Sequence, residues 1–277
     1  MARSTSAVES AATAADQFFT VAGARLRYRD QGHGPAVLCV HGWTLDLEMW
    51  EPQAAALCDR FRVVRLDRRG HGLSEGVSST EADAGDLLAL CEHLSLREVA
   101  LLGMSQGARV AAQAAVAGRR VWALILDGPP PLGGGTETDV PLERYRALVH
   151  DRGMSDFRRE WARHPLTQLR THDPGRHALL GSALARYSGN DLQAAARAEA
   201  SDLPARLAKL QVPILIVSGQ HDLPTRIRAA DELARQLGAE RVVIAGAGHL
   251  PNLDCADAYS DCCRHFLGRC GPVCLSS

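Results

Sequence analysis

The 277-residue sequence lacks an excess of charge of either sign. It also lacks an apolar run of the roughly 18 residues that a membrane-spanning helix needs. Its 31 basic and 32 acidic residues give a net charge of −1, which offers no support for binding to nucleic acid or to an anionic membrane. No internal repeat is evident. With 46% hydrophobic residues, the chain is long enough for one large α/β domain, or for such a domain with an insertion.

The first residues also lack the continuous apolar core of a secretory signal, although they are rich in alanine, serine and threonine. We therefore expect a disordered segment over residues 1–16 and a cytoplasmic chain with reduced thiols. Five of the eight cysteines lie in the last 23 residues. Their spacing matches no familiar zinc pattern, so we expect no metal and no cofactor. Reduced thiols, a Cys270–Cys274 disulfide and a metal-bound form stay open for these cysteines.

Short apolar runs alternate with helical patterns along the chain. This alternation is typical of an α/β fold with a mostly parallel sheet flanked by helices. The predicted strands cover residues 18–21, 25–28, 36–40, 61–66, 99–102, 121–126, 212–217 and 241–245. The predicted helices cover residues 49–58, 82–94, 108–117, 227–237 and 256–267.

The alternation stops over residues 132–209, where helical patterns and turns occur without a convincing strand. We interpret this segment as a helical cap inserted after the sixth strand, with residues 17–131 and 210–277 forming the core. In sheets of this kind, ligands bind beyond the carboxyl ends of the strands. The loops at those ends therefore carry the candidate site.

One such loop places a serine between two glycines, in Gly103-Met104-Ser105-Gln106-Gly107. The pattern G-x-S-x-G after a strand and before a helix predicts a tight turn that lifts the serine hydroxyl above the sheet. Glycines at the flanks remove the Cβ atoms that would clash where the helix approaches the strand. The helix N-terminus supplies backbone N–H groups that stabilise a developing negative charge. We therefore predict Ser105 as a nucleophile.

A serine nucleophile needs a base and a group that orients the base. Asp222 follows the strand at residues 212–217, and His249 follows the strand at residues 241–245. The order Ser, Asp, His is that of the α/β-hydrolase fold, so we predict His249 as the base and Asp222 as its orienter. Asp127, which also ends a strand, is the alternative acid.

An acyl-transfer site also needs donors for the oxyanion. The backbone N–H groups of Gln106 and of Trp43, in the loop after residues 36–40, are the candidates. His41 is expected to buttress this loop through hydrogen bonds and not to act on the substrate. Judged from loop position, Trp43 and five further side chains are candidates for the substrate pocket: Met104, Leu132, Trp161, Leu223 and Leu250. Arg109 is a sixth further candidate, for the reason given below.

These residues together resemble the α/β-hydrolase superfamily from about residue 18 onward. The resemblance is carried by HGWTLDLEMW at residues 41–50, DRRGHGLS at 67–74, GMSQG at 103–107 and GHLPNLD at 248–254. It looks closest to small cofactor-free carboxylesterases, perhydrolase-type arylesterases and 3-oxoadipate enol-lactonases. It implies the roles given above for Ser105, His249, Asp222 and the two oxyanion donors. Perhydrolase-type members tend to have proline directly after HGW, where this chain has Thr44.

The sequence therefore predicts a serine hydrolase that cleaves a small-molecule carboxylic ester or lactone through an acyl-enzyme. Two alternatives remain. The stretch Ser105-Gln106-Gly107-Ala108-Arg109 is similar to the S-x-G-G-R of a menaquinone-pathway lyase, in which Arg109 would bind a substrate carboxylate. A small-molecule receptor with slow turnover is the other. The substrate and the oligomeric state are left open.

Overall fold

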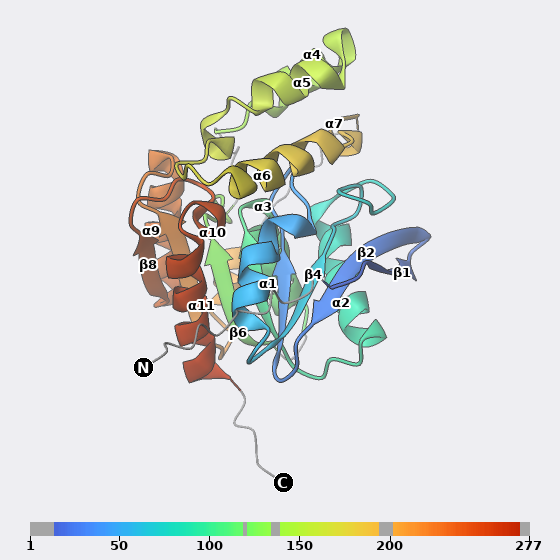
Figure 1. The fold of residues 1–277 in the computed structure, drawn as a ribbon. Helices are drawn as coiled ribbons and strands as arrows, with labels where there is room; N and C mark the ends of the chain where they lie inside the picture. The colour runs from blue at the N-terminus through green and yellow to red at the C-terminus, as the bar shows by residue number, and fades with distance from the viewer. Residues whose placement is uncertain (1–13, 119–120, 134–138, 194–201, 272–277) are drawn as a thin grey trace, which may run out of the picture.

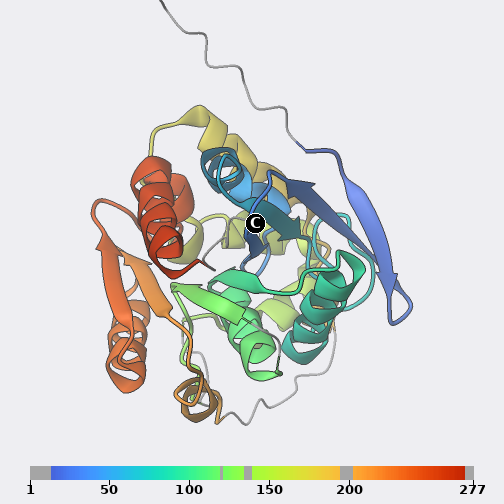
Figure 2. The ribbon, with the colours of Figure 1, turned by 90° about the horizontal axis from the view of Figure 1, so that it is seen from below.

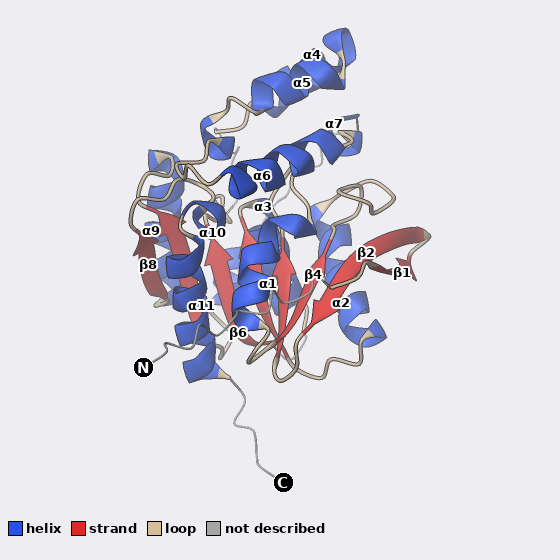
Figure 3. Ribbon diagram, viewed as in Figure 1, coloured by secondary structure: helices blue, strands red, loops and turns tan. Residues whose placement is uncertain are grey.

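The computed structural model describes residues 14–118, 121–133, 139–193 and 202–271. Within these residues, an eight-stranded sheet has the order β1-β2-β4-β3-β5-β6-β7-β8 (Figure 3). The strands are β1 (Gln17–Val21), β2 (Ala24–Gln31), β3 (Ala36–Val40), β4 (Arg62–Leu66), β5 (Val99–Met104), β6 (Val121–Asp127), β7 (Ile214–Gly219) and β8 (Glu240–Ile244). Only β2 runs antiparallel to its neighbours, β1 and β4; every other pairing in this sheet is parallel. The predicted mostly parallel sheet is therefore confirmed.

Two proline residues account for two of the differences between the observed and the predicted elements. β7 begins at Ile214, two residues later than expected, because Pro213 has no N–H to donate to the ladder. The helix expected over residues 49–58 is split into a 3-10 turn, η1 (Leu47–Trp50), and α1 (Glu51–Leu57). Pro52 lies in the first turn of α1, where its missing N–H would have no intrahelical partner.

Helices cover both faces of the sheet, as Figure 2 shows. One face carries α2 (Thr80–His93), α3 (Gln106–Val116) and α9 (Pro224–Leu237). The other carries α1 and α11 (Ala256–Cys270), with the short α10 (Pro251–Asp254) beside them. The inner parallel strands are buried along nearly their whole length; for example, every residue of β3 and β5 is buried, whereas the edge strand β8 is partly exposed. Apolar burial on both faces holds these strands in place and fixes where their carboxyl ends lie.

The segment between β6 and β7 contains helices and no strand among its described residues. Its elements are α4 (Leu142–Arg152), α5 (Met154–Trp161), the 3-10 turn η2 (Pro165–Thr167), α6 (Pro174–Arg186), α7 (Asn190–Gln193) and α8 (Leu203–Leu207). Figure 1 shows α4 to α7 above one end of the sheet, and we call these four helices with η2 the cap. The insertion after the sixth strand is therefore confirmed. α8 instead packs against α3 and α9, so the boundary at residue 209 stays a prediction.

Several predictions are only partly tested by the described residues. In the described ranges, no helix is long and apolar enough to cross a membrane; the cytoplasmic location stays a prediction. The seven cysteines in these ranges are free thiols. No group of three metal-binding side chains occurs among the described residues. Cys274 and residues 1–13 lie outside them, so the Cys270–Cys274 pair and the N-terminal segment stay untested.

Candidate active site

Ser105 occupies the sharp turn between β5 and α3. Its backbone has φ 53° and ψ −120°, a region that costs a non-glycine residue on the order of 1–3 kcal/mol. The surrounding fold holds this conformation: the Ser105 N–H donates to the Asp127 carbonyl at 2.7 Å, and the Ser105 carbonyl accepts from the Ala108 N–H at 2.9 Å. The turn thereby presents the serine side chain at the carboxyl end of β5, as predicted for a nucleophile.

The two flanking glycines are required by close backbone contacts. A Cβ atom at Gly103 would collide with the Gly107 carbonyl, and one at Gly107 would collide with the carbonyls of Val40 and His41. α3 can therefore cross β5 and β3 at this short distance only when both positions lack a side chain. This confirms the reason for which the glycines were singled out.

His249 and Asp222 meet above the ends of β7 and β8. The imidazole Nδ1 lies 2.8 Å from Asp222 Oδ2 and 3.0 Å from Oδ1. Both side chains are almost fully buried. The Leu223 N–H donates to Asp222 Oδ1 at 2.7 Å, which fixes the carboxylate. Since Nδ1 faces the carboxylate, Nε2 is the ring nitrogen left to exchange a proton with a nucleophile.

Asp127, the alternative acid, is placed differently. It is fully buried at the end of β6, and burial raises the pKa of its carboxyl group well above the usual value, with the Asp222 carboxylate adding to the shift. Burial of this kind favours the neutral, protonated form of a carboxyl group over the charged one. The carboxylate that is hydrogen-bonded to His249 belongs to Asp222. The geometry therefore favours Asp222 as the group that orients the base.

The two residues whose N–H groups are predicted to bind the oxyanion have anchored side chains. Trp43 Nε1 donates to Asp191 Oδ2 on α7 at 2.7 Å, and Asp191 also accepts from the Tyr187 hydroxyl at 2.5 Å. Gln106, the first residue of α3, accepts through Oε1 from Arg68 at 2.6 Å. One anchor lies in the cap and the other in the core.

Two buried histidines support the loop beneath Trp43. His41 Nε2 accepts from the Arg68 N–H at 2.9 Å, and its Nδ1 donates to the Gly42 carbonyl at 2.8 Å. Burial lowers the pKa of His41 well below its usual value. Burial also lowers the pKa of His71 to about 4, with the Arg68 charge acting in the same direction. Both rings are therefore neutral at pH 7, and His41 has the buttressing contacts expected of it.

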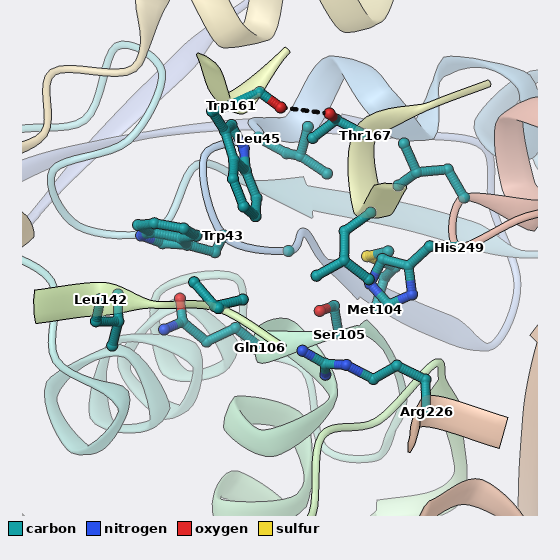
Figure 4. A pocket seen from close by; sticks show the side chains of 14 residues that line it. Trp43, Leu45, Met104, Ser105, Gln106, Leu142, Trp161, Thr167, Arg226 and His249 are labelled. Carbon is teal, nitrogen blue, oxygen red and sulfur yellow. Dashed lines mark hydrogen bonds between the residues drawn. The ribbon is translucent and has the colours of Figure 1, made fainter. Parts of the chain in front are cut away.

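A largely apolar pocket opens over Ser105 between the core and the cap (Figure 4). Fourteen residues line it: Gly42, Trp43, Leu45, Met104, Ser105, Gln106, Val140, Leu142, Trp161, Leu166, Thr167, Arg226, His249 and Leu250. The list includes the predicted nucleophile, base and both oxyanion donors. It also includes three of the predicted pocket residues, Met104, Trp161 and Leu250. The cap therefore forms one wall of the pocket, and the catalytic turn forms the opposite wall (Figure 4).

The other three predicted pocket residues do not line this pocket. Arg109 points to the cap entrance, where its guanidinium donates to the Pro131 carbonyl at 2.5 Å. Leu132 is buried in the core cluster that includes α3 and α8 residues. Leu223 caps α9 and packs beside the other core cluster. Leu132 and Leu223 were predicted from loop position, but the direction of a side chain depends on packing that its neighbours in sequence do not set. Arg109 was predicted from its similarity to the lyase pattern.

Sequence reasoning missed six side chains of the wall: four from the cap and its entrance, one from the core, and Arg226. Arg226 directly precedes the helix predicted over residues 227–237, and it is only 1% exposed. The missed cap side chains are Val140, Leu142, Leu166 and Thr167, with Leu45 from the core. The cap docks through aromatic contacts: the rings of Trp43 and Trp161 lie 4.8 Å apart, and Trp161 Nε1 donates to Thr44 Oγ1 at 2.7 Å.

Comparison with known proteins agrees with this geometry. The profile of the family described as alpha/beta hydrolase fold matches residues 35–255. A non-heme haloperoxidase from Rhodococcus erythropolis is 31% identical over 82% of this chain and 90% of its own. A thermophilic esterase from Thermogutta terrifontis has a TM-score of 0.80 and 30% identity over 94% of this chain and 100% of its own. An enol-lactonase from Burkholderia xenovorans LB400 has a TM-score of 0.77 and 27% identity, over 91% and 100%.

Proposed function

Because the chain belongs to the α/β-hydrolase family, we propose that it hydrolyses a carboxylic ester or lactone through an acyl-enzyme intermediate. The observation that carries this proposal is the pair of hydrogen bonds between His249 Nδ1 and Asp222, with Ser105 on its strained turn in the same pocket. The likeness to an esterase and to an enol-lactonase supports it.

The first half-reaction follows from these roles. His249 accepts the Ser105 hydroxyl proton through Nε2 while Oγ attacks the ester carbonyl carbon. The N–H groups of Trp43 and Gln106 receive the negative charge that develops on the carbonyl oxygen. Asp222 stabilises the imidazolium that forms, and this imidazolium then protonates the leaving alcohol. In a lactone the leaving alcohol stays attached to the acyl group.

The second half-reaction returns the enzyme to its starting state. His249 takes a proton from water, and the resulting hydroxide attacks the acyl carbon. Ser105 leaves with the proton from the imidazolium, and the carboxylic acid is released. The apolar side chains that face the turn, including Met104, Trp161 and Leu250, provide the surface against which the acyl group packs.

Two competing chemistries have less support. The lyase alternative depends on Arg109 as a carboxylate receptor, and Arg109 does not line the pocket. Peracid chemistry is associated, in the resemblance described above, with proline after HGW. Thr44 at this position has a φ of 63°, which proline cannot adopt because its ring fixes φ near −65°.

The test is Ser105→Ala, assayed with p-nitrophenyl butyrate and with a fluorescent organophosphonate. We expect kcat to fall on the order of 10⁶-fold, as for loss of a triad serine, and labelling to disappear. Ser95→Ala is the matched control, since Ser95 also has a positive φ, 54°, in a turn after α2, and it should keep both signals. Turnover that persists in Ser105→Ala contradicts the serine mechanism. A burst of one equivalent followed by negligible turnover in the wild type would favour the receptor.

A further inference from the structure

Arg226 is the one arginine or lysine among the residues that line the pocket in the described part of the chain. It lies in the first turn of α9, four positions after Asp222. Figure 4 shows its side chain reaching from α9 to a position beside Ser105, on the side of the pocket opposite Trp161. A cation thus lies next to the predicted nucleophile.

Asp139 holds the Arg226 guanidinium in place. Arg226 Nε lies 2.9 Å from Asp139 Oδ2, and the Thr225 hydroxyl donates to Asp139 Oδ1 at 2.5 Å. Asp139 sits just before the cap, outside the pocket lining. Burial lowers the pKa of Arg226 to about 10, and the positive charge of Arg109 acts in the same direction. Arg226 therefore stays protonated at neutral pH, with a second guanidinium adding to the positive potential.

The rest of the lining offers little to a second charged group. Thr167 donates its hydroxyl to the carbonyls of Trp161 and His164, and the Gln106 amide oxygen is engaged by Arg68. The remaining wall is largely apolar: Leu45, Met104, Val140, Leu142, Leu166 and Leu250. A buried cation in such surroundings interacts strongly with an anion because the dielectric screening is low.

We propose that the pocket takes an ester or lactone whose acyl part carries a carboxylate, and that Arg226 binds that carboxylate. This inference rests on the proposed function for the reaction and adds the class of substrate. A planar guanidinium matches a carboxylate through parallel N–H donors. The anchored Nε fixes the plane of the group in advance, which lowers the entropy lost on binding.

The experiment compares p-nitrophenyl hydrogen adipate with p-nitrophenyl hexanoate, which share a six-carbon acyl chain and differ in a terminal carboxylate or methyl group. We expect Arg226→Gln to lower the adipate-to-hexanoate ratio of kcat/KM at least tenfold. Arg226→Lys keeps the charge without the planar fork and should lie between the two. Arg269→Gln is the matched control: it removes an exposed cation that is paired with Glu240, and the ratio should not change.

Two further variants separate charge recognition from folding. Asp139→Asn leaves the cation in place and should keep or raise the ratio. The double variant Asp139→Asn/Arg226→Gln avoids a buried unpaired carboxylate. Its adipate-to-hexanoate ratio of kcat/KM should fall as much as that of Arg226→Gln. If Arg226→Gln fails to fold, the double variant decides. A ratio that stays within twofold of the wild-type value in the folded variants overturns the proposal.

A binding measurement keeps this inference separate from the proposed reaction. In a Ser105→Ala background, calorimetry should show tighter binding of monomethyl adipate than of methyl hexanoate, and Arg226→Gln should remove the difference. Equal binding of the two esters overturns the inference whatever the turnover is. Failure of the wild type to hydrolyse either aryl ester contradicts the proposed function alone.

Discussion

Replacing each of the two buried carboxyl groups by its amide should separate their roles. Asp222 accepts the His249 Nδ1–H at 2.8 Å and is the charged partner of the imidazolium that forms during attack. In Asp222→Asn, the amide can donate to Nδ1 and thereby favour the tautomer whose Nε2 carries the proton. That tautomer cannot accept the Ser105 proton. Loss of the orienting carboxylate in a triad lowers kcat about 10⁴-fold, which corresponds to about 5.5 kcal/mol of transition-state stabilisation.

Asp127→Asn should have a much smaller effect. Because burial raises the pKa of Asp127 well above its usual value, the fold favours the neutral form of this group, which an amide of the same shape resembles. The substitution also keeps the Ser105 N–H bond to the backbone carbonyl of residue 127. We expect less than about a tenfold loss of kcat, or under about 1.4 kcal/mol. The assay is kcat for a p-nitrophenyl ester at pH 7.5, with circular dichroism to check each fold. Losses of equal size at the two positions would refute this assignment.

The other two predictions concern acid stability and the cap. His41 and His71 are neutral in the folded protein, and their pKa values lie below the unfolded value of about 6.5. The stability that these neutral rings contribute is therefore present above pH 6.5 and is lost as the pH falls toward 4, because the unfolded state binds the extra protons. At about 1.36 kcal/mol for each pH unit by which the pKa is lowered, His71 alone accounts for about 3 kcal/mol of the free energy of unfolding. In urea titrations between pH 6.5 and 4, the stability of His71→Gln should therefore fall less steeply than that of the wild type. An unchanged slope would contradict the prediction. Asp191→Ala removes the acceptor of the Trp43 indole N–H and the Tyr187 hydroxyl, and a hydrogen bond to a charged group contributes about 1.5–3 kcal/mol. We expect Asp191→Ala to lower kcat roughly 10- to 100-fold with little change in KM. The control variant Asp151→Ala, on the exposed face of the cap, should have no effect. A change confined to KM would argue against a role of Asp191 in holding the oxyanion site.

The order of the elements and the positions of the three catalytic candidates could be predicted because the signals are local. A buried strand is recognisable from its own apolar run, and a parallel sheet brings the carboxyl ends of its strands to one edge. Ser105, Asp222 and His249 each follow such a run directly, so their convergence depended on topology alone. The choice between Asp222 and Asp127 required the structure, since both end a strand and only the side-chain contact distinguishes them.

The pocket wall could not be predicted to the same extent. Leu132 was predicted in the pocket from its loop position and Arg109 from its similarity to the lyase pattern, but Leu132 is buried in the core and Arg109 donates to the Pro131 carbonyl. Arg226 was missed because an arginine in the first turn of a helix is usually exposed. Its burial results from contact with Asp139, which lies 87 positions earlier in the chain.

The backbone of Ser105 has an evolutionary consequence. A glycine at this position would adopt φ 53° without strain, so the most stable sequence for this turn is one that cannot perform the reaction. Enzymes commonly give up some stability to keep an active site strained. Selection for heat resistance alone would therefore favour loss of the nucleophile, and a serine persists here only while catalysis is also selected.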